Sequence, residues 1–399
     1  MKKNLFYAFA LIGSMGFFAA CSDDDGKGTI NTELLKELNT TFTTGNESAS
    51  FALTYSDAPM VGKTATFNSA DGKTATIVLA GTTMSQLKPI LGVDLVNSGV
   101  VPGETSTTLN VNLTPVGDTG FAFEGTDGSN GRTLTYKGTI EKGKLSMDVD
   151  VAFADNNLTG TWNLFQKKET DNIFPIRMVW NSSVPLLGAL QPGAILEIVA
   201  QLPLIGEGDN KLPLVTAISA LLQNVTFGTD GNIIASYSDT SNMAAPVWQS
   251  SPANMLQYVV KDGMVYVYLN VEAIMSAAAT SQTSTKSLNL NTILNLLLPK
   301  LPEIAPMLTN GIPLGYTVDE NGMLGVYIEE TQLGAVLVDV VTELLSNEEV
   351  LAAIKEMVAS TPGMEDMASL IDYVLPQLPA TIEATTDMEL GLNFTKTTE

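Results

Sequence analysis

The sequence contains no histidine and a single cysteine, and these two absences exclude most of the common catalytic and metal chemistries. Without histidine there is no Ser-His-Asp or Cys-His site, no histidine-ligated zinc and no histidine general base. With one cysteine there is no disulfide within the chain, so burial of apolar side chains alone must stabilise the fold. We therefore expect no metal and no cofactor. Any enzymatic activity would depend on carboxylate, tyrosine or lysine side chains.

Basic residues are also scarce. The chain has 20 Lys and Arg against 43 Asp and Glu, which gives a net charge of −23 at pH 7. Nucleic acids and anionic bilayer surfaces are bound through positively charged protein surfaces, so neither is an expected partner. The length of 399 residues and the hydrophobic fraction of 45% are sufficient for two folded domains without disulfides.

The N-terminus has the pattern of a secretory signal that ends at the cysteine. Two lysines, at positions 2 and 3, precede an apolar run over residues 5–20, which ends in two alanines directly before Cys21. The run is shorter than the roughly 20 apolar residues that span a bilayer. We therefore expect residues 1–20 to be a signal peptide, and Cys21 to be acylated after cleavage, so that a lipid anchors the protein to a membrane.

An acidic stretch follows the cysteine, formed by Ser22, Asp23, Asp24 and Asp25. It resembles the export signal of Bacteroides-type surface lipoproteins. The resemblance implies transfer to the outward-facing leaflet of the outer membrane. Because the acidic chain is not expected to bind an anionic bilayer surface, the lipid is the membrane contact that we expect. A simple polar tether is the alternative, because the sequence continues as a flexible linker. We assign 21–44 to this lipidated tether and linker.

Residues 45–168 predict antiparallel β structure. Apolar and polar residues alternate, most clearly over 145–153, and turn sequences such as Asp71-Gly72 and Lys142-Gly143 separate the strands. About eight strands in sequential hairpins predict an up-and-down β-barrel. The stretch 136–149 is similar to the late hairpin of calycin-like β-barrel domains in Bacteroides-type lipoproteins. That resemblance implies a small apolar ligand in the barrel mouth, although the barrel's own side chains can equally fill such an interior.

Residues 169–399 predict an α+β domain in which helices cover one face of an antiparallel sheet. Apolar runs predict helices over 194–202, 214–222, 288–298, 333–345, 350–358 and 367–375. Hairpins are predicted over 225–237, 256–269 and 314–328, a final strand over 382–394, and an exposed loop over 276–287. The first and third hairpins each follow an apolar helix, which indicates either a degenerate duplication or a chance similarity.

Three side chains in this second region are candidates for ligand binding. Trp248 follows a proline in a polar segment, where it would stack on a sugar or anchor the core. Met307 and Met323 lie in and near the proline-rich segment 296–314, where adaptable methionine side chains would line an apolar pocket or fill core gaps. The adjacent acidic pairs, such as Glu329-Glu330, do not have the facing geometry of a glycosidase. No calcium loop or phosphate loop is recognisable.

The sequence therefore favours a non-catalytic binding module at the cell surface, with a small apolar molecule or a glycan as its ligand. Two alternatives stay open. One is a carboxylate-dependent hydrolase that acts on glycans, and the other is a structural partner of an outer-membrane protein complex.

Overall fold

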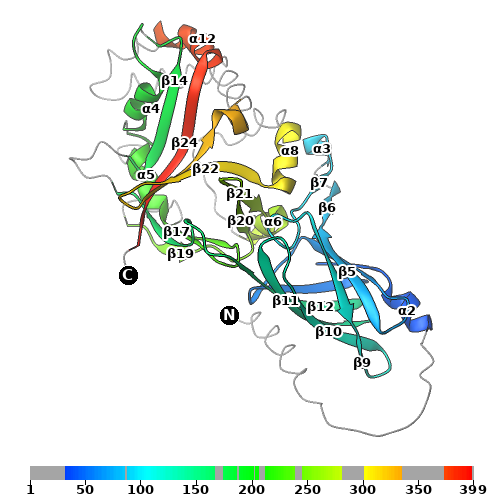
Figure 1. Cartoon of the computed structure of the whole chain (residues 1–399). Helices are drawn as coiled ribbons and strands as arrows, with labels where there is room; N and C mark the ends of the chain where they lie inside the picture. The colour runs from blue at the N-terminus through cyan, green and yellow to red at the C-terminus, as the bar shows by residue number, and fades with distance from the viewer. Residues whose placement is uncertain are drawn as a thin grey trace.

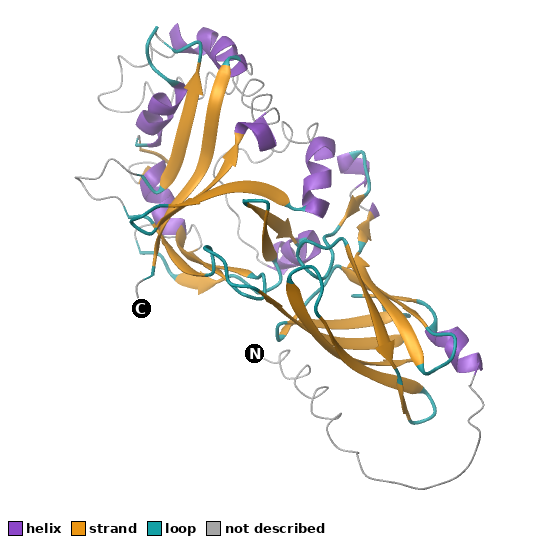
Figure 2. Ribbon diagram, viewed as in Figure 1, coloured by secondary structure: helices purple, strands orange, loops and turns teal. Residues whose placement is uncertain are grey.

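The chain folds around two large curled β-sheets that lie side by side (Figure 1). Strands are the main secondary structure of the described residues, with short helices around the second sheet (Figure 2). The computed structural model describes residues 32–85, 88–166, 174–186, 188–201, 203–205, 212–238, 245–280, 301–334 and 373–397. Within these ranges, no helix has the length and apolar character needed to cross a bilayer.

The first sheet is a nearly closed barrel. Its strands are β1 (Thr41–Thr43), β2 (Ser50–Tyr55), β3 (Ala58–Pro59), β4 (Lys63–Asn68), β5 (Thr74–Gly81), β8 (Ser106–Asn112), β9 (Thr114–Val116), β10 (Gly120–Asp127), β11 (Arg132–Glu141) and β12 (Lys144–Phe153). They lie in the order β8-β5-β4-β1-β2-β12-β11-β10-β9, with β3 paired to β2. The two ends, β8 and β9, are consecutive parts of one strand on either side of Leu113. That strand therefore brings the two edges of the sheet together.

The barrel closes with a parallel pair, which differs from the wholly antiparallel meander that we predicted. Strand β2 runs parallel to β12, from the pair Ser50 and Lys144 to the pair Tyr55 and Val149. The reason lies in the number of passes across the barrel. The chain crosses the barrel seven times from one end to the other. Strands β1 and β2 together form one crossing, as do β3 with β4 and β8 with β9, and β5, β10, β11 and β12 form one crossing each. Because this number is odd, the first and last crossings run in the same direction.

Two segments depart from the predicted barrel limits of 45 and 168. Helix α2 (Thr32–Leu38) and β1 precede residue 45, yet Leu35, Leu38 and Phe42 are buried in the barrel core. The expected tether is therefore folded structure from Thr32 onward. At the other end, β13 (Gly160–Leu164) pairs with strands of the second sheet, so this stretch leaves the barrel. In both cases the segment belongs to the sheet whose core buries its apolar side chains.

Side chains of the barrel itself fill its interior. The alternating pattern sends the apolar residues of each strand inward, where Phe42, Tyr55, Phe67, Ile77 and Leu79 are almost completely buried. The barrel core is one continuous cluster of such residues. An interior packed in this way stabilises the fold, and it leaves the outer face of the barrel as the surface that meets other molecules.

The second sheet is built from strands distant in the sequence. They are β13, β14 (Ile176–Ser182), β17 (Leu222–Phe227), β18 (Ile233–Ser238), β19 (Trp248–Ser250), β20 (Leu256–Lys261), β21 (Met264–Leu269), β22 (Ile312–Val318), β23 (Met323–Glu329) and β24 (Thr385–Lys396). The order is β19-β18-β17-β13-β24-β23-β22-β21-β20, with β14 paired to β24. All three predicted hairpins are confirmed, as β17–β18, β20–β21 and β22–β23. The predicted final strand is β24, which pairs with three others.

Short helices accompany this sheet: α4 (Pro192–Ala200), α5 (Leu214–Leu221), α6 (Val271–Thr280), α8 (Leu301–Asn310) and α12 (Leu378–Glu383). The first two correspond to the helices predicted over 194–202 and 214–222. The helices predicted over 288–298 and 350–358 lie outside the described residues, as do most residues of those over 333–345 and 367–375. Helix α6 corrects the predicted loop, which begins four residues before this helix ends. Helix α8 contains Pro306 and continues through it.

Polar contacts join the two sheets directly. Asn254 is 1% exposed, and its Nδ2 donates to Ala58 O at 2.9 Å and Tyr55 O at 3.1 Å. The Tyr55 hydroxyl donates to Asp230 O at 2.6 Å. Gly231 has a φ of +80°, and a Cβ there would lie 3.0 Å from the Phe153 ring. These buried contacts fix the barrel against the second sheet, because each hydrogen bond joins a side chain of one sheet to a backbone carbonyl of the other.

An apolar cluster adds to this junction. Met84 of β6 (Thr83–Met84) and Leu95 of β7 (Leu95–Val96) pack with Ala305 of α8. A short helix, α3 (Lys88–Leu91), lies between β6 and β7 in the chain.

Candidate functional site

The structure separates the residues that we singled out from the sequence. Cys21 and Ser22, Asp23, Asp24 and Asp25 lie outside the described residues. Trp248 begins the edge strand β19 and is half-buried, beside Val247, which is 77% exposed. Met307 is on α8, and Met323 begins β23, which β18, β17, β13 and β24 separate from β19 in the sheet order. These three residues come from different parts of the fold, and they do not form one binding site.

Two other aromatic residues of the second region, Trp180 and Tyr258, are core anchors. Trp180 is 7% exposed, and its Nε1 donates to Thr385 Oγ1 at 2.9 Å. Tyr258 is buried, and its hydroxyl donates to Gly228 O at 3.1 Å. Their polar atoms have partners within the fold, as buried tyrosine and tryptophan usually require.

The most distinctive surface is the outer side of four adjacent barrel strands, β1, β4, β5 and β8, which we call the neutral face. Its outward positions alternate with the buried core positions, and only Val78 and Ala80 among them are apolar. The others carry a hydroxyl or an amide and no charge: Thr41, Thr43, Thr64, Thr66, Asn68, Thr74, Thr76, Ser106, Thr108, Asn110 and Asn112. A net charge of −23 makes such an uncharged surface unusual for this chain.

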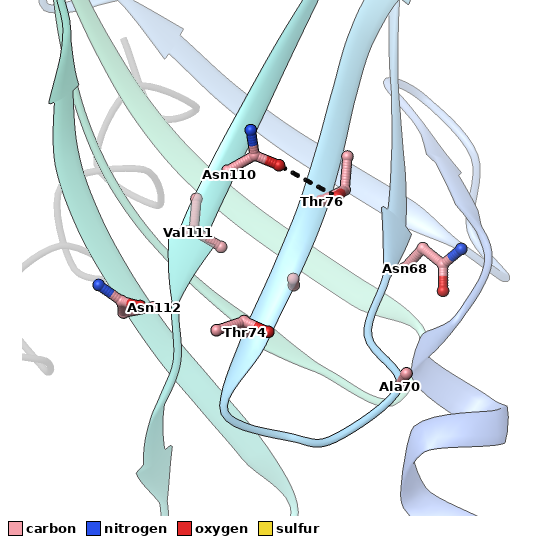
Figure 3. A pocket seen from close by; sticks show the side chains of 8 residues that line it. Asn68, Ala70, Thr74, Thr76, Asn110, Val111 and Asn112 are labelled. Atoms are coloured by element: carbon pink, nitrogen blue, oxygen red, sulfur yellow. Dashed lines mark hydrogen bonds between the residues drawn. The ribbon is translucent and has the colours of Figure 1, made fainter.

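Strand register arranges these side chains in rows that cross the strands. Asn68 lies opposite Thr76 on β5, and Thr76 lies opposite Asn110 on β8. We call these three residues the Asn-Thr-Asn row. Thr76 Oγ1 donates to Asn110 Oδ1 at 3.3 Å within it (Figure 3). A neighbouring row begins with Thr41 and Thr66, whose hydroxyls are 2.8 Å apart.

The Asn-Thr-Asn row borders a shallow hollow of about 370 Å³ (Figure 3). Asn112 and Thr74, which lie opposite each other in the next row, complete its polar rim, and Ala70, Ala75 and Val111 supply apolar surface. Within the described part of the chain, the side-chain amides of Asn68 and Asn112 make no hydrogen bond to protein. Their donor and acceptor groups are therefore free to bind a ligand.

The opposite side of the barrel carries both acidic and basic side chains. Across β10, β11 and β12, Glu124 lies opposite Lys137, and Lys137 lies opposite Asp148, with a Lys137–Asp148 separation of 3.8 Å. Cross-strand pairs of opposite charge stabilise an exposed sheet. The two sides of one barrel therefore present different surfaces, and only one of them is free of charge.

A local sequence pattern produces the neutral face. The segments 64–68, 74–77 and 108–112 alternate Thr or Asn with an apolar residue, and threonine is favoured in strands because its β-branched side chain fits the pleated surface. The alternation of apolar and polar residues in these segments predicts strands, but it does not by itself indicate a binding surface. The absence of charge at the outward positions was the signal that could have located this face.

A second polar cluster lies on the outer face of the other sheet. Glu329 and Glu389 are opposite each other on β23 and β24. Arg177 donates from Nε to Glu389 at 2.5 Å, and its guanidinium lies 4.7 Å from the centre of the Tyr327 ring. Burial raises the pKa of Tyr327, as does the charge of Glu389. Facing carboxylates would repel each other, and Arg177 offsets this, so the cluster is accounted for as stabilisation of the sheet.

Two buried cations are structural as well. Lys63 Nζ donates to Ser98 O at 2.8 Å and Gly99 O at 2.9 Å, which holds the loop at the end of the barrel. Burial lowers the pKa of Lys63 to about 7, and the charge of Glu272 opposes this shift. Arg132 bonds Asp127 at 2.6 Å, and this hydrogen bond lowers the pKa of the Asp127 carboxyl. In the described ranges, no group of three or more His, Cys, Asp or Glu residues could hold a metal ion.

Comparison of the chain with family models, with curated proteins and with solved structures finds no match. The function is therefore argued from the residues and their arrangement.

Proposed function

We propose that this chain is a lipid-anchored glycan-binding protein of the outer-membrane surface, without catalytic activity, and that the neutral face is its binding surface. The observation that carries the proposal is the set of uncharged amides and hydroxyls around the hollow, with Asn68 and Asn112 free of protein partners in the described ranges. A sugar presents hydroxyl groups that both donate and accept, as threonine and asparagine side chains do.

The filled barrel favours a glycan over a small apolar ligand. A calycin-like barrel binds an apolar molecule inside, and we keep the resemblance of residues 136–149 to such domains as part of the proposal. Here Phe42, Tyr55 and Phe67 occupy that space. Binding inside would require these side chains to leave a closely packed core, which is energetically costly. The outer face needs no such rearrangement.

The N-terminal sequence supports the location. A signal peptide that ends at Cys21 and an acidic stretch over 22–25 are the features expected of an acylated, surface-exported protein. Several acyl chains on one residue give stable anchoring, where a single chain is marginal.

The location can be tested with one substitution. We expect Cys21→Ala to move the protein from the membrane fraction to the soluble fraction of the producing cells, with Ser22→Ala as the matched control that stays in the membrane. Digestion of intact cells by an added protease, followed by immunoblotting, reports exposure. A Cys21→Ala protein that stays with the membrane contradicts lipid anchoring. A wild-type protein that resists digestion until the cells are opened contradicts surface exposure.

Binding can be tested by titrating the purified protein with a panel of soluble oligosaccharides in a calorimeter. Asn68→Ala and Asn110→Ala should each weaken the binding of any sugar that binds the wild type. Thr139→Ala, an exposed substitution on β11 of the charged side, should leave the affinity unchanged. Equal affinities for all four proteins, or no binding of any sugar, would contradict the proposal. Capture of an outer-membrane protein through the neutral face would instead favour the role of structural partner.

A further inference from the structure

We infer that the ligand of the neutral face is an uncharged glycan in an extended, β-linked conformation, which lies across the strands along the Asn-Thr-Asn row. This inference rests on the proposed function and specifies the class and the orientation of the ligand.

The orientation follows from the spacing of the side chains. Adjacent strands lie about 4.8 Å apart, whereas successive outward residues on one strand lie about 6.7 Å apart. An extended, β-linked chain whose sugar units advance by about this strand spacing is the form of glycan that matches the row. A chain that crosses the strands therefore meets Asn68, Thr76 and Asn110 with successive sugar units. A chain that runs along a strand would lose this match after one unit.

The shape of the surface supports an extended ligand. The hollow is shallow, and its lining residues come from three adjacent strands, β4, β5 and β8, so a ligand that fills it contacts more than one strand. Its volume of about 370 Å³ is at the small end of ligand sites, which are commonly about 300–1,000 Å³. The hollow thus holds a short part of the chain, and neighbouring sugar units lie on the flat sheet beside it. A compact helical glycan would contact fewer strands.

The charge distribution of the protein favours an uncharged ligand. The neutral face offers no cation to pair with an acidic sugar, and the chain as a whole carries a charge of −23. An anionic glycan would be repelled by the overall field of the protein. An uncharged glycan is not repelled by this field, and each of its hydroxyl groups can form a hydrogen bond with an amide or a threonine hydroxyl.

The test is calorimetric titration of the full-length protein in detergent with four hexasaccharides. Cellohexaose and mannohexaose are uncharged and extended, maltohexaose is uncharged and helical, and the galacturonic acid hexamer is charged. We expect at least one of the first two to bind more tightly than both of the others. Asn68→Ala and Asn110→Ala should each weaken that binding by about 2- to 10-fold, the effect of one net hydrogen bond. Asn112→Ala, in the next row of the same hollow, should weaken it less than either of these two variants, and Thr139→Ala, on the charged side of the barrel, should change it less than 2-fold.

The other outcomes are distinguishable. If the acidic or the helical hexasaccharide binds best and the Asn68 and Asn110 variants weaken it, the ligand class is wrong and the proposed function stands. If Asn110→Ala and Asn112→Ala weaken binding while Asn68→Ala does not, the ligand lies along β8 and the orientation is wrong. If no hexasaccharide binds, or no variant changes the affinity, the proposed function itself fails. Unchanged thermal unfolding of each variant shows that a loss of affinity is not a loss of fold.

Discussion

Lys63 makes the stability of this protein depend on pH in a range where few of its other groups titrate. The side chain is fully buried, and its Nζ bonds two carbonyl oxygens and Ser98 Oγ. Burial lowers its pKa from 10.5 to about 7, because the charged form is poorly solvated inside the barrel, while the charge of Glu272 opposes the shift. The chain has no histidine, so the window from pH 6 to 9 reports mainly on this lysine.

The direction of the effect follows from proton linkage. Between about pH 7 and pH 10 the unfolded chain keeps a proton on this lysine that the folded chain has released. The free energy of unfolding therefore rises with pH, by up to about 1.4 kcal/mol per pH unit. From pH 7 to pH 9 the gain is about 2 kcal/mol. Below pH 7 both states are protonated, and the contribution of Lys63 becomes constant.

Urea unfolding, followed by far-ultraviolet circular dichroism, which reports on both sheets, measures this gain. We expect the Cys21→Ala protein, which lacks the thiol, to show the rise between pH 7 and 9. Lys63→Met in the same background should lack it. The variant loses the donor to Ser98 O and Gly99 O, which costs about 1–3 kcal/mol for each carbonyl group left unpaired. Its deficit relative to Lys63 should therefore be larger at pH 9 than at pH 6.5. Stability profiles that run parallel, within about 0.5 kcal/mol, would refute the reasoning.

Three further predictions concern stability and use the same unfolding assay. Asn254→Ala should cost about 1–3 kcal/mol because it removes two buried hydrogen bonds across the junction, whereas Asn68→Ala, an exposed substitution of the same kind, should cost less than about 0.5 kcal/mol. Similar losses for both would contradict the role of the junction. Arg132→Met should cost about 3–5 kcal/mol because it leaves two carboxylates beside a buried site without their cation, and a loss below about 1 kcal/mol would count against this. Gly315→Ala should cost about 1–3 kcal/mol because its Cβ would lie 2.5 Å from the Tyr327 ring, and an unchanged midpoint would show that the ring moves freely.

The candidate site was less predictable than the strands. Each hairpin in the second region has a turn with glycine between two apolar runs, and such local signals determine a hairpin wherever it lies in the fold. Trp248, Met307 and Met323 were chosen for their side-chain chemistry, but separation in space is not a local property. The neutral face was visible as alternating Thr and Asn in three segments, yet their alignment into rows depends on strand register.

The sequence alone determined the class of chemistry and the local elements of this protein. The lack of histidine and the single cysteine limited the catalytic groups, and the alternation of apolar residues predicted the strands, because both depend only on residue identity and spacing. The tertiary structure decided the rest. It placed β12 parallel to β2, moved 160–164 into the second sheet, and brought Asn68, Thr76 and Asn110 into one row. These outcomes depend on pairing between distant strands, which is set by how the whole core packs and not by any one segment.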